Sequence, residues 1–129
     1  MKKPLITLCL LFVLCTIACK NEVKTSSHEI ITVISQEEMQ NLLKLDNVQF
    51  VDVRTPEEFR QGHAEGSINI PLQEVQQRFD ELKSLQQPLI LCCASGARSG
   101  QATAFLKSNN IDCENGGSWF DVSANYQQA

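Results

Sequence analysis

The stretch of sequence that decides the fold is Leu89-Ile90-Leu91-Cys92-Cys93-Ala94-Ser95-Gly96-Ala97-Arg98-Ser99. It begins as an apolar run behind Pro88, which is typical of a strand buried on both faces of a sheet. Small residues then form a tight loop, and a helical pattern begins at Ser99. Cys93 therefore stands where a strand ends and a helix follows. This geometry points backbone N–H groups and the positive end of a helix dipole at the cysteine sulfur.

These surroundings predict a nucleophilic cysteine. Backbone N–H donors and a helix N-terminus stabilise a thiolate, so they lower the pKa of a thiol without a dedicated general base. Arg98 adds a permanent positive charge and a forked set of donors. We therefore predict that Cys93 is catalytic. The alternative, a small buried apolar cysteine, fits the strand but does not explain the loop, the helix and the arginine that follow it.

Composition allows one ordinary globular domain. The chain has 129 residues, of which 43% are hydrophobic and 20% are charged. A net charge of −4 argues against nucleic acid as a partner, because phosphate binding needs a basic face. The sequence has no Cys-x-x-Cys spacing and no cluster of histidines, so it predicts no metal site and no cofactor.

Residues 1–18 are typical of a secretory signal peptide. Lys2 and Lys3 form a basic start, and the apolar run at 5–17 is shorter than the about 20 residues that span a bilayer. The run leads to Leu-Cys-Thr-Ile-Ala-Cys at 14–19, which resembles a bacterial lipoprotein signal with Cys19 as the lipidated residue. Thr16 departs from the leucine usual in that family, and simple secretion or a retained anchor are the alternatives.

The remaining chain divides into two parts under this interpretation. We expect residues 19–29 to be a polar tether and residues 30–126 to form the folded domain. The protein would lie outside the cytoplasm, in the cell envelope of a bacterium (periplasm or outer membrane), and the lipid on Cys19 would anchor it to the membrane. Loss of Lys2 and Lys3 makes the chain more acidic, so anchoring would not depend on a basic patch.

Strand and helix patterns alternate along the folded part. The strand patterns lie at 31–34, 48–53, 67–70, 89–93 and 111–114. Helix patterns follow capping boxes at Ser35 and Thr55, cover residues 72–84, run from Ser99 to about Lys107, and end the domain around Trp119. This alternation predicts an α/β fold with helices on both faces of a parallel sheet, and a reactive site beyond the carboxyl ends of the strands.

Three segments of the sequence resemble the single-domain rhodanese-like proteins, a family of sulfurtransferases. They are VDVRTPEEF at 51–59 with Gly62-His63, GSINIPL at 66–72, and CASGARS at 93–99 with GGSW at 116–119. Together they span most of the folded part in the family's order. The resemblance implies a rhodanese-like fold, in which helices flank both faces of a central parallel sheet of five strands. The sequence has five strand patterns.

The resemblance also implies the chemistry. Cys93 would alternate between a thiolate and a persulfide, taking sulfane sulfur from thiosulfate or a persulfide donor and passing it to a thiophilic acceptor such as cyanide or a thiol. The backbone of the loop would cradle the outer sulfur, and Arg98 would stabilise its negative charge. The substrate-binding residues are then Ala94, Ser95, Gly96, Ala97, Arg98 and Ser99.

Three other functions stay open from the residues. A non-catalytic module for binding or sulfur delivery keeps the fold without using the thiol. A thiol–disulfide redox protein would pair Cys93 with Cys92 or Cys113, although alternation along a strand turns Cys92 toward the core. A cysteine-dependent phosphatase or arsenate reductase needs a loop one residue longer than the four residues between Cys93 and Arg98.

Several polar side chains near the predicted strand ends are catalytic in type. We favour a structural interpretation of Asp52, Arg54 and Glu58. They lie at a strand end and a helix start, where side chains form hydrogen bonds between segments. The resemblance places His63 in a loop motif that the family uses for packing. We therefore expect none of these side chains to act as a general base.

Overall fold

The computed structural model describes residues 31–128. The predicted signal peptide, the lipidation site at Cys19 and the tether lie outside the described residues. Within residues 31–128, no helix is both long enough and apolar enough to cross a membrane.

Four parallel strands form the centre of the molecule in the order β2-β1-β3-β4. Their bounds are β1 (Gln49–Asp52), β2 (Ile68–Asn69), β3 (Leu89–Cys93) and β4 (Cys113–Ser118). The helices are α1 (Gln36–Leu43), α2 (Pro56–Gln61), the 3-10 helix η1 (Leu72–Glu74), α3 (Phe79–Ser84), α4 (Ala97–Ser108) and α5 (Trp119–Tyr126). Every residue of β3 is buried, as the apolar run predicted.

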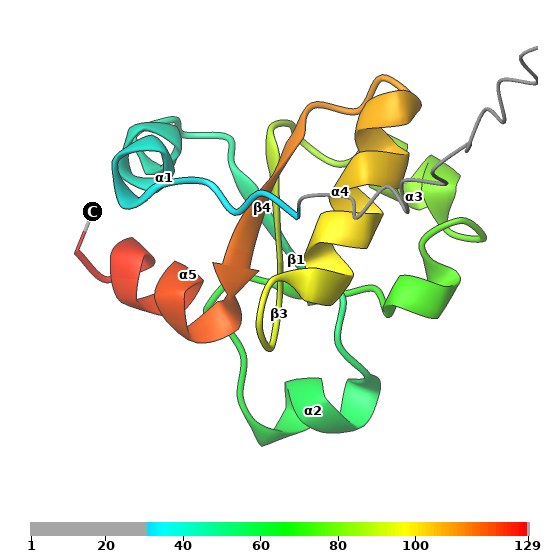
Figure 1. The fold of residues 1–129 in the computed structure, drawn as a ribbon, viewed down its shortest axis with the longest axis horizontal. Helices are drawn as coiled ribbons and strands as arrows, with labels where there is room; N and C mark the ends of the chain where they lie inside the picture. Colours follow the sequence, from blue (N-terminus) through cyan, green and yellow to red (C-terminus); the bar gives the residue numbers. More distant parts are fainter. Residues whose placement is uncertain (1–30, 129) are drawn as a thin grey trace, which may run out of the picture.

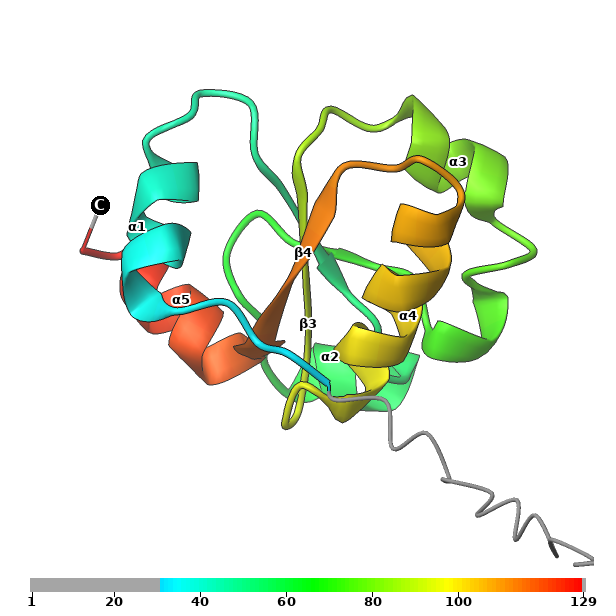
Figure 2. The ribbon, with the colours of Figure 1, turned by 45° about the horizontal axis from the view of Figure 1, so that its top comes forward.

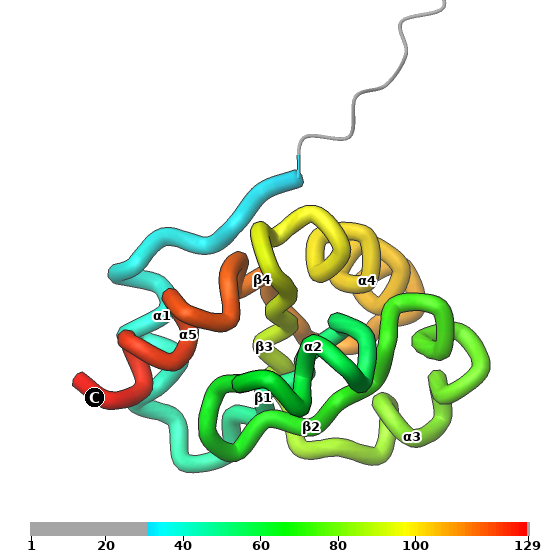
Figure 3. Tube along the Cα trace, turned by 90° about the horizontal axis from the view of Figure 1, so that it is seen from below, coloured from blue at the N-terminus to red at the C-terminus, as the bar shows by residue number. Residues whose placement is uncertain are grey.

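Helices cover both faces of this sheet, so the predicted fold class is confirmed. Figure 1 shows α1 and α5 on one side of the strands and α3 and α4 on the other, and Figure 2 shows the same two layers in a turned view. The α4 face buries Val51, Leu89 and Leu91, and the α1–α5 face buries Phe50 and Ile90. Helix α2 lies at the carboxyl end of the strands, as Figure 3 shows from below.

The prediction of five strands is wrong by one strand. Among the described residues the sheet has four strands, and residues 31–34 do not form a fifth. This segment runs beside β4, where the Ile34 N–H donates to the Asn115 carbonyl at 3.0 Å. Ile31 and Val33 keep 42% and 43% of their surface exposed. A β-branched composition reports how well side chains fit a pleated surface and does not by itself create a hydrogen-bonded ladder.

Two further expectations about the elements change in detail. The helix expected at 72–84 is divided into η1 and α3, with a turn between them. Strand β4 continues through the glycines at 116 and 117, where the register with β3 shifts and Gly116 becomes the extra residue of a bulge. A Cβ on Gly116 would lie 2.6 Å from Ile90 Cγ2, so the close packing of the bulge requires glycine there.

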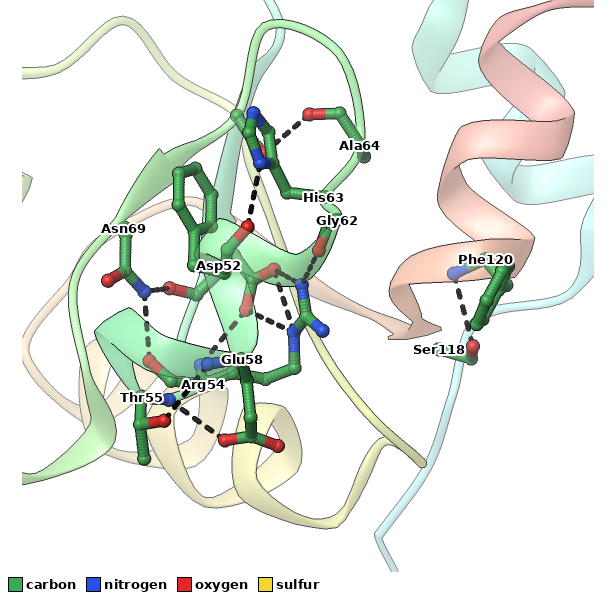
Figure 4. Close-up of polar contacts among 12 residues, drawn as sticks. Asp52, Arg54, Thr55, Glu58, Gly62, His63, Ala64, Asn69, Ser118 and Phe120 are labelled. Atoms are coloured by element: carbon green, nitrogen blue, oxygen red, sulfur yellow. Dashed lines mark hydrogen bonds and ion pairs between the residues drawn. The ribbon is translucent and has the colours of Figure 1, made fainter.

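A buried ion pair ties the end of β1 to the neighbouring loop. Arg54 Nη2 lies 2.6 Å from Asp52 Oδ2 and also donates to the Gly62 carbonyl at 2.6 Å. The guanidinium carbon lies 4.7 Å from the centre of the Trp119 ring. Figure 4 shows Arg54 between the Asp52 carboxylate and the Gly62 carbonyl. These contacts join the end of β1 to the loop at Gly62 and to Trp119, which is the hydrogen bonding between segments that the sequence interpretation expected.

Arg54→Ala tests how much this brace stabilises the fold. Because the substitution leaves the fully buried Asp52 carboxylate without its cation, we expect the free energy of unfolding to fall by about 3–5 kcal/mol. The matched control is Arg60→Ala, since the Arg60–Glu57 pair is exposed and its loss should leave stability almost unchanged. Urea denaturation measures both, and equal stabilities of the two variants would show that the buried pair is not a brace.

Candidate active site

Cys93 lies at the carboxyl end of β3, and the loop after it leads directly into α4 (Figure 1). Gly96 caps α4 with a φ of 93°, in the left-handed region that favours glycine. A Cβ at this position would also lie 2.9 Å from Val33 Cγ2 and 3.3 Å from Gly117 Cα. The loop therefore rests on the end of β4 and on the segment before α1, which fixes its path around the sulfur.

The Cys93 sulfur accepts hydrogen bonds from this loop. The Gly96 N–H donates to Sγ at 3.1 Å, and the Ser99 hydroxyl oxygen lies 3.4 Å from Sγ. Burial by itself would raise the pKa of the Cys93 thiol. Hydrogen bonds from the Ser99 side chain and from the N–H groups of Ser99, Ser95 and Gly96 outweigh burial, so the pKa lies below its ordinary value. The arrangement favours a thiolate, which is the nucleophilic form.

The structure places some of the residues predicted to bind substrate against the sulfur and leaves others exposed. Ser95, Gly96 and Ser99 direct backbone N–H groups at it. Ala94 is an exposed loop residue, and Ala97 is the exposed first residue of α4. Their contacts with a substrate stay a prediction.

Arg98 is held by a carboxylate from α2. Its Nη1 and Nη2 donate to Glu58 Oε2 and Oε1 at 2.7 and 2.8 Å, and Glu58 Oε2 also accepts the Thr55 N–H at 3.0 Å. Figure 4 shows Glu58 beside Thr55. The hydrogen bonds from Arg98, and then from the Thr55 backbone, lower the pKa of Glu58 to about 2. The sequence indicated the helix cap but not this ion pair, and a direct role of Arg98 on the sulfur stays a prediction.

The other two cysteines of the folded part do not share the site. Cys92 points to the opposite face of the sheet, where it packs with Phe50 and Ile90, so its predicted orientation is confirmed. Burial raises the pKa of the Cys92 thiol above its ordinary value. All three described cysteines are free.

Cys113 lies at the other end of the sheet from Cys93. It pairs with Leu89, whereas Cys93 pairs with Ser118. The separation along β3 is about 13 Å at about 3.3 Å per residue, and a disulfide requires Cα atoms within about 7 Å. This separation keeps the Cys113 thiol from resolving a persulfide on Cys93. Burial also raises the pKa of Cys113 to about 11.

Sequence reasoning missed one residue of the site, Asn115. Its side chain is 2% exposed and contacts both the Ser99 hydroxyl and the Gly96 carbonyl. Asparagine is depleted in strands and is mostly exposed in proteins. Asn115 directly follows the predicted strand at 111–114, and the structure extends that strand through it, so local sequence gave no signal for this position. Among the described residues, no cluster of histidine, cysteine and carboxylate side chains is suited to a metal ion.

Comparisons with known proteins agree with this architecture. The sequence pattern of the rhodanese-like domain matches residues 35–123. The uncharacterised protein YqhL of Bacillus subtilis is 43% identical over 61 residues, which cover 47% of this chain and 48% of that protein. Thiosulfate sulfurtransferase PspE of Escherichia coli is 36% identical over 76 residues, which cover 57% of this chain and 73% of that protein.

A solved structure shows the same fold. The crystal structure of a rhodanese-like domain protein from Staphylococcus aureus superposes with a TM-score of 0.54 at 33% identity, covering 71% of this chain and 90% of that chain. The match to this chain thus spans about half of the Bacillus relative and most of the Staphylococcus protein. With its matched domain, its parallel sheet and the Cys93 loop between β3 and α4, the chain belongs to the rhodanese-like domain family.

Proposed function

We propose that the protein is a sulfurtransferase that carries sulfane sulfur as a persulfide on Cys93. The observation that carries the proposal is the sulfur of Cys93, which is buried at a strand end and yet surrounded by N–H and O–H donors. Relatives of this chain include proteins named as sulfurtransferases, among them PspE. The donor would be thiosulfate or a persulfide, and the acceptor would be cyanide or a thiol.

The first step forms the persulfide. The Cys93 thiolate attacks the outer sulfur of thiosulfate, the S–S bond of the donor breaks, and sulfite leaves with the bonding electron pair. An acceptor such as cyanide then attacks the outer sulfur of the persulfide and leaves as thiocyanate, while the Cys93 thiolate departs with its electron pair. Each step exchanges one nucleophile for another at sulfur, so no cofactor enters the balance, and the kinetics should be ping-pong.

The loop supplies what both steps need. Negative charge on sulfur is consumed or released at each transfer, and preorganised N–H donors act on such charge as it develops. Ser95 and Gly96 provide these N–H groups from a loop that packs on β4, and Ser99 provides one from the first turn of α4. With four residues between Cys93 and Arg98, the ring of donors suits one sulfur atom better than a tetrahedral oxyanion.

Cys93→Ala tests the nucleophile. We expect it to abolish the formation of thiocyanate from thiosulfate and cyanide, because among residues 31–128 the two other thiols, Cys92 and Cys113, are buried and have raised pKa values. The matched control is Cys113→Ala, which removes an equally buried thiol at the far end of the sheet and should keep most of the activity. Thiocyanate is measured by colour with ferric ion. Turnover by Cys93→Ala at the parent rate would mean that the mechanism is wrong.

Arg98→Ala tests whether the arginine acts on the donor. If Arg98 donates a charged hydrogen bond to the thiosulfate anion, loss of that bond weakens binding of thiosulfate. We therefore expect the KM for thiosulfate to rise about tenfold or more. The control is Arg60→Ala, which removes the same charge from the exposed side of α2. Steady-state kinetics measures both variants. An unchanged KM in folded Arg98→Ala would assign Arg98 only to its ion pair with Glu58.

We further propose that this reaction takes place outside the cytoplasm, with the protein anchored to a membrane by lipid on Cys19. The support is the apolar run at 5–17 that ends in Ala18-Cys19.

Cys19→Ser tests the anchor. In a bacterial host the mature parent protein should begin at Cys19 and carry the added mass of a diacylglyceryl group on that residue, whereas Cys19→Ser should carry no such mass. Cys15→Ser serves as the control, since it removes a cysteine within the apolar run and should leave lipidation intact. Absence of the lipid mass from Cys19 of the parent protein would contradict the proposed anchor.

A further inference from the structure

Asn115 is a buried amide that begins the bulge of β4. Its Nδ2 donates to the carbonyls of Thr32 and Gly96 at 3.2 and 3.1 Å. Its Oδ1 accepts from the Ser99 hydroxyl at 2.7 Å and from the Gly117 N–H at 3.1 Å. Two carbonyls on one side and two donors on the other fix which atom of the side chain is the oxygen, and every hydrogen-bonding position of the amide is used.

The Ser99 hydroxyl has one proton and faces two acceptors. Its oxygen lies 2.7 Å from Asn115 Oδ1 and 3.4 Å from Cys93 Sγ. While Cys93 is a thiol, its S–H can donate to the Ser99 oxygen, and the hydroxyl donates to Asn115. Once the thiol proton has left to solvent, the hydroxyl turns and donates to the thiolate. The hydroxyl proton stays on Ser99 throughout.

The contacts of Asn115 allow the Ser99 hydroxyl to rotate toward the sulfur. When the hydroxyl leaves Oδ1, the Gly117 N–H still donates to it, so the buried oxygen keeps a partner. The penalty of an unsatisfied buried polar atom is thereby avoided in both protonation states. The site therefore has a complete hydrogen-bond arrangement for the thiol and another for the thiolate.

We propose that Asn115 is a positioning residue for Cys93, which acts through Ser99 by competing with the sulfur for the Ser99 hydroxyl proton. In the resting thiol, Asn115 holds the hydroxyl with an oxygen lone pair toward the sulfur. Asn115 releases the hydroxyl as negative charge develops on the Cys93 sulfur, because a hydrogen bond to the sulfur is then most stabilising. The inference rests on the proposed function for its part in sulfur transfer, but the competition itself concerns the free thiol.

The substitutions at Ser99 and Asn115 remove none of the charged and titratable groups on the surrounding elements. They are Arg98 and Lys107 on α4, Asp52 and Arg54 at the end of β1, Cys92 on β3, Glu114 on β4, Glu58 on α2 and Asp121 on α5. Glu58, with a pKa of about 2, remains ionised near neutral pH, and burial keeps Cys92 protonated. A difference in pH profile between variants of Ser99 and Asn115 therefore reports the hydrogen bonds of these two residues.

The test is the rate of Cys93 alkylation by iodoacetamide as a function of pH, read by peptide mass spectrometry with no sulfur donor present. Ser99→Ala should slow alkylation at neutral pH about tenfold, because the thiolate loses a charge-assisted hydrogen bond. The matched control is Thr103→Ala, one turn further along α4, where the buried hydroxyl has no hydrogen-bond partner within residues 31–128. This control should leave the profile unchanged.

Asn115→Ala should move the profile in the opposite direction. It removes the competing acceptor, so alkylation at neutral pH should become faster, and the double variant Ser99→Ala with Asn115→Ala should match Ser99→Ala alone. Slower alkylation in Asn115→Ala, or a double variant that differs from Ser99→Ala, would overturn the competition and leave Asn115 as a support of the loop.

A second variant keeps the test decisive if Asn115→Ala does not fold. Asn115→Asp retains the shape, and its carboxyl is held protonated at the oxygen that faces the Thr32 and Gly96 carbonyls. The remaining carbonyl oxygen is a weaker acceptor for the Ser99 hydroxyl than the amide oxygen, so alkylation at neutral pH should become faster, and an unchanged or slower rate would overturn the proposal. Because no sulfur donor is present, the alkylation rates are independent of the sulfur-transfer assay. The expected profiles without any thiocyanate formation would contradict the proposed function and leave the role of Asn115 intact.

Discussion

The hydrogen bonds that reach the buried sulfur of Cys93 are the interaction on which the site depends. A thiolate in an apolar strand end without donors would be driven back to a thiol by desolvation. The loop prevents this by directing N–H groups at the sulfur, among them the Gly96 N–H at 3.1 Å. Cys92 shows the contrast, because it directly precedes Cys93 in the same strand and burial there raises its pKa. The same strand thus holds one thiol with a lowered pKa and one with a raised pKa, one on each face.

The fold keeps these donors in place from three directions. Strand β3 delivers the cysteine, α4 begins with the glycine that turns the loop, and β4 supplies the surface on which the loop rests. The bulge at Gly116 lies directly after Asn115, so the strand that supports the loop also carries the amide that contacts it. Helix α2 adds Glu58, whose ion pair with Arg98 joins the first turn of α4 to a separate part of the chain.

Much of this arrangement could be predicted from local sequence. The apolar run at 89–93, the capping boxes at Ser35 and Thr55, and the opposite orientation of Cys92 follow from burial, helix capping and strand alternation. The prediction of a strand at 31–34 was wrong. A strand needs a neighbouring strand to form a hydrogen-bonded ladder, and the composition of the segment does not show whether such a neighbour is present. Asn115 and the Arg98–Glu58 pair join positions far apart in sequence, and such contacts depend on the strand order and the path of the chain, which local patterns do not contain.

The most direct test of sulfur transfer through Cys93 follows the label of the donor. Thiosulfate labelled at its outer sulfur is incubated with the protein and removed, and the peptide that contains Cys93 is isolated without reductant. We predict that this peptide retains the label, and that thiosulfate labelled at its inner sulfur leaves none, because that atom departs as sulfite. Label from neither position on Cys93, in a folded protein, would contradict the persulfide mechanism.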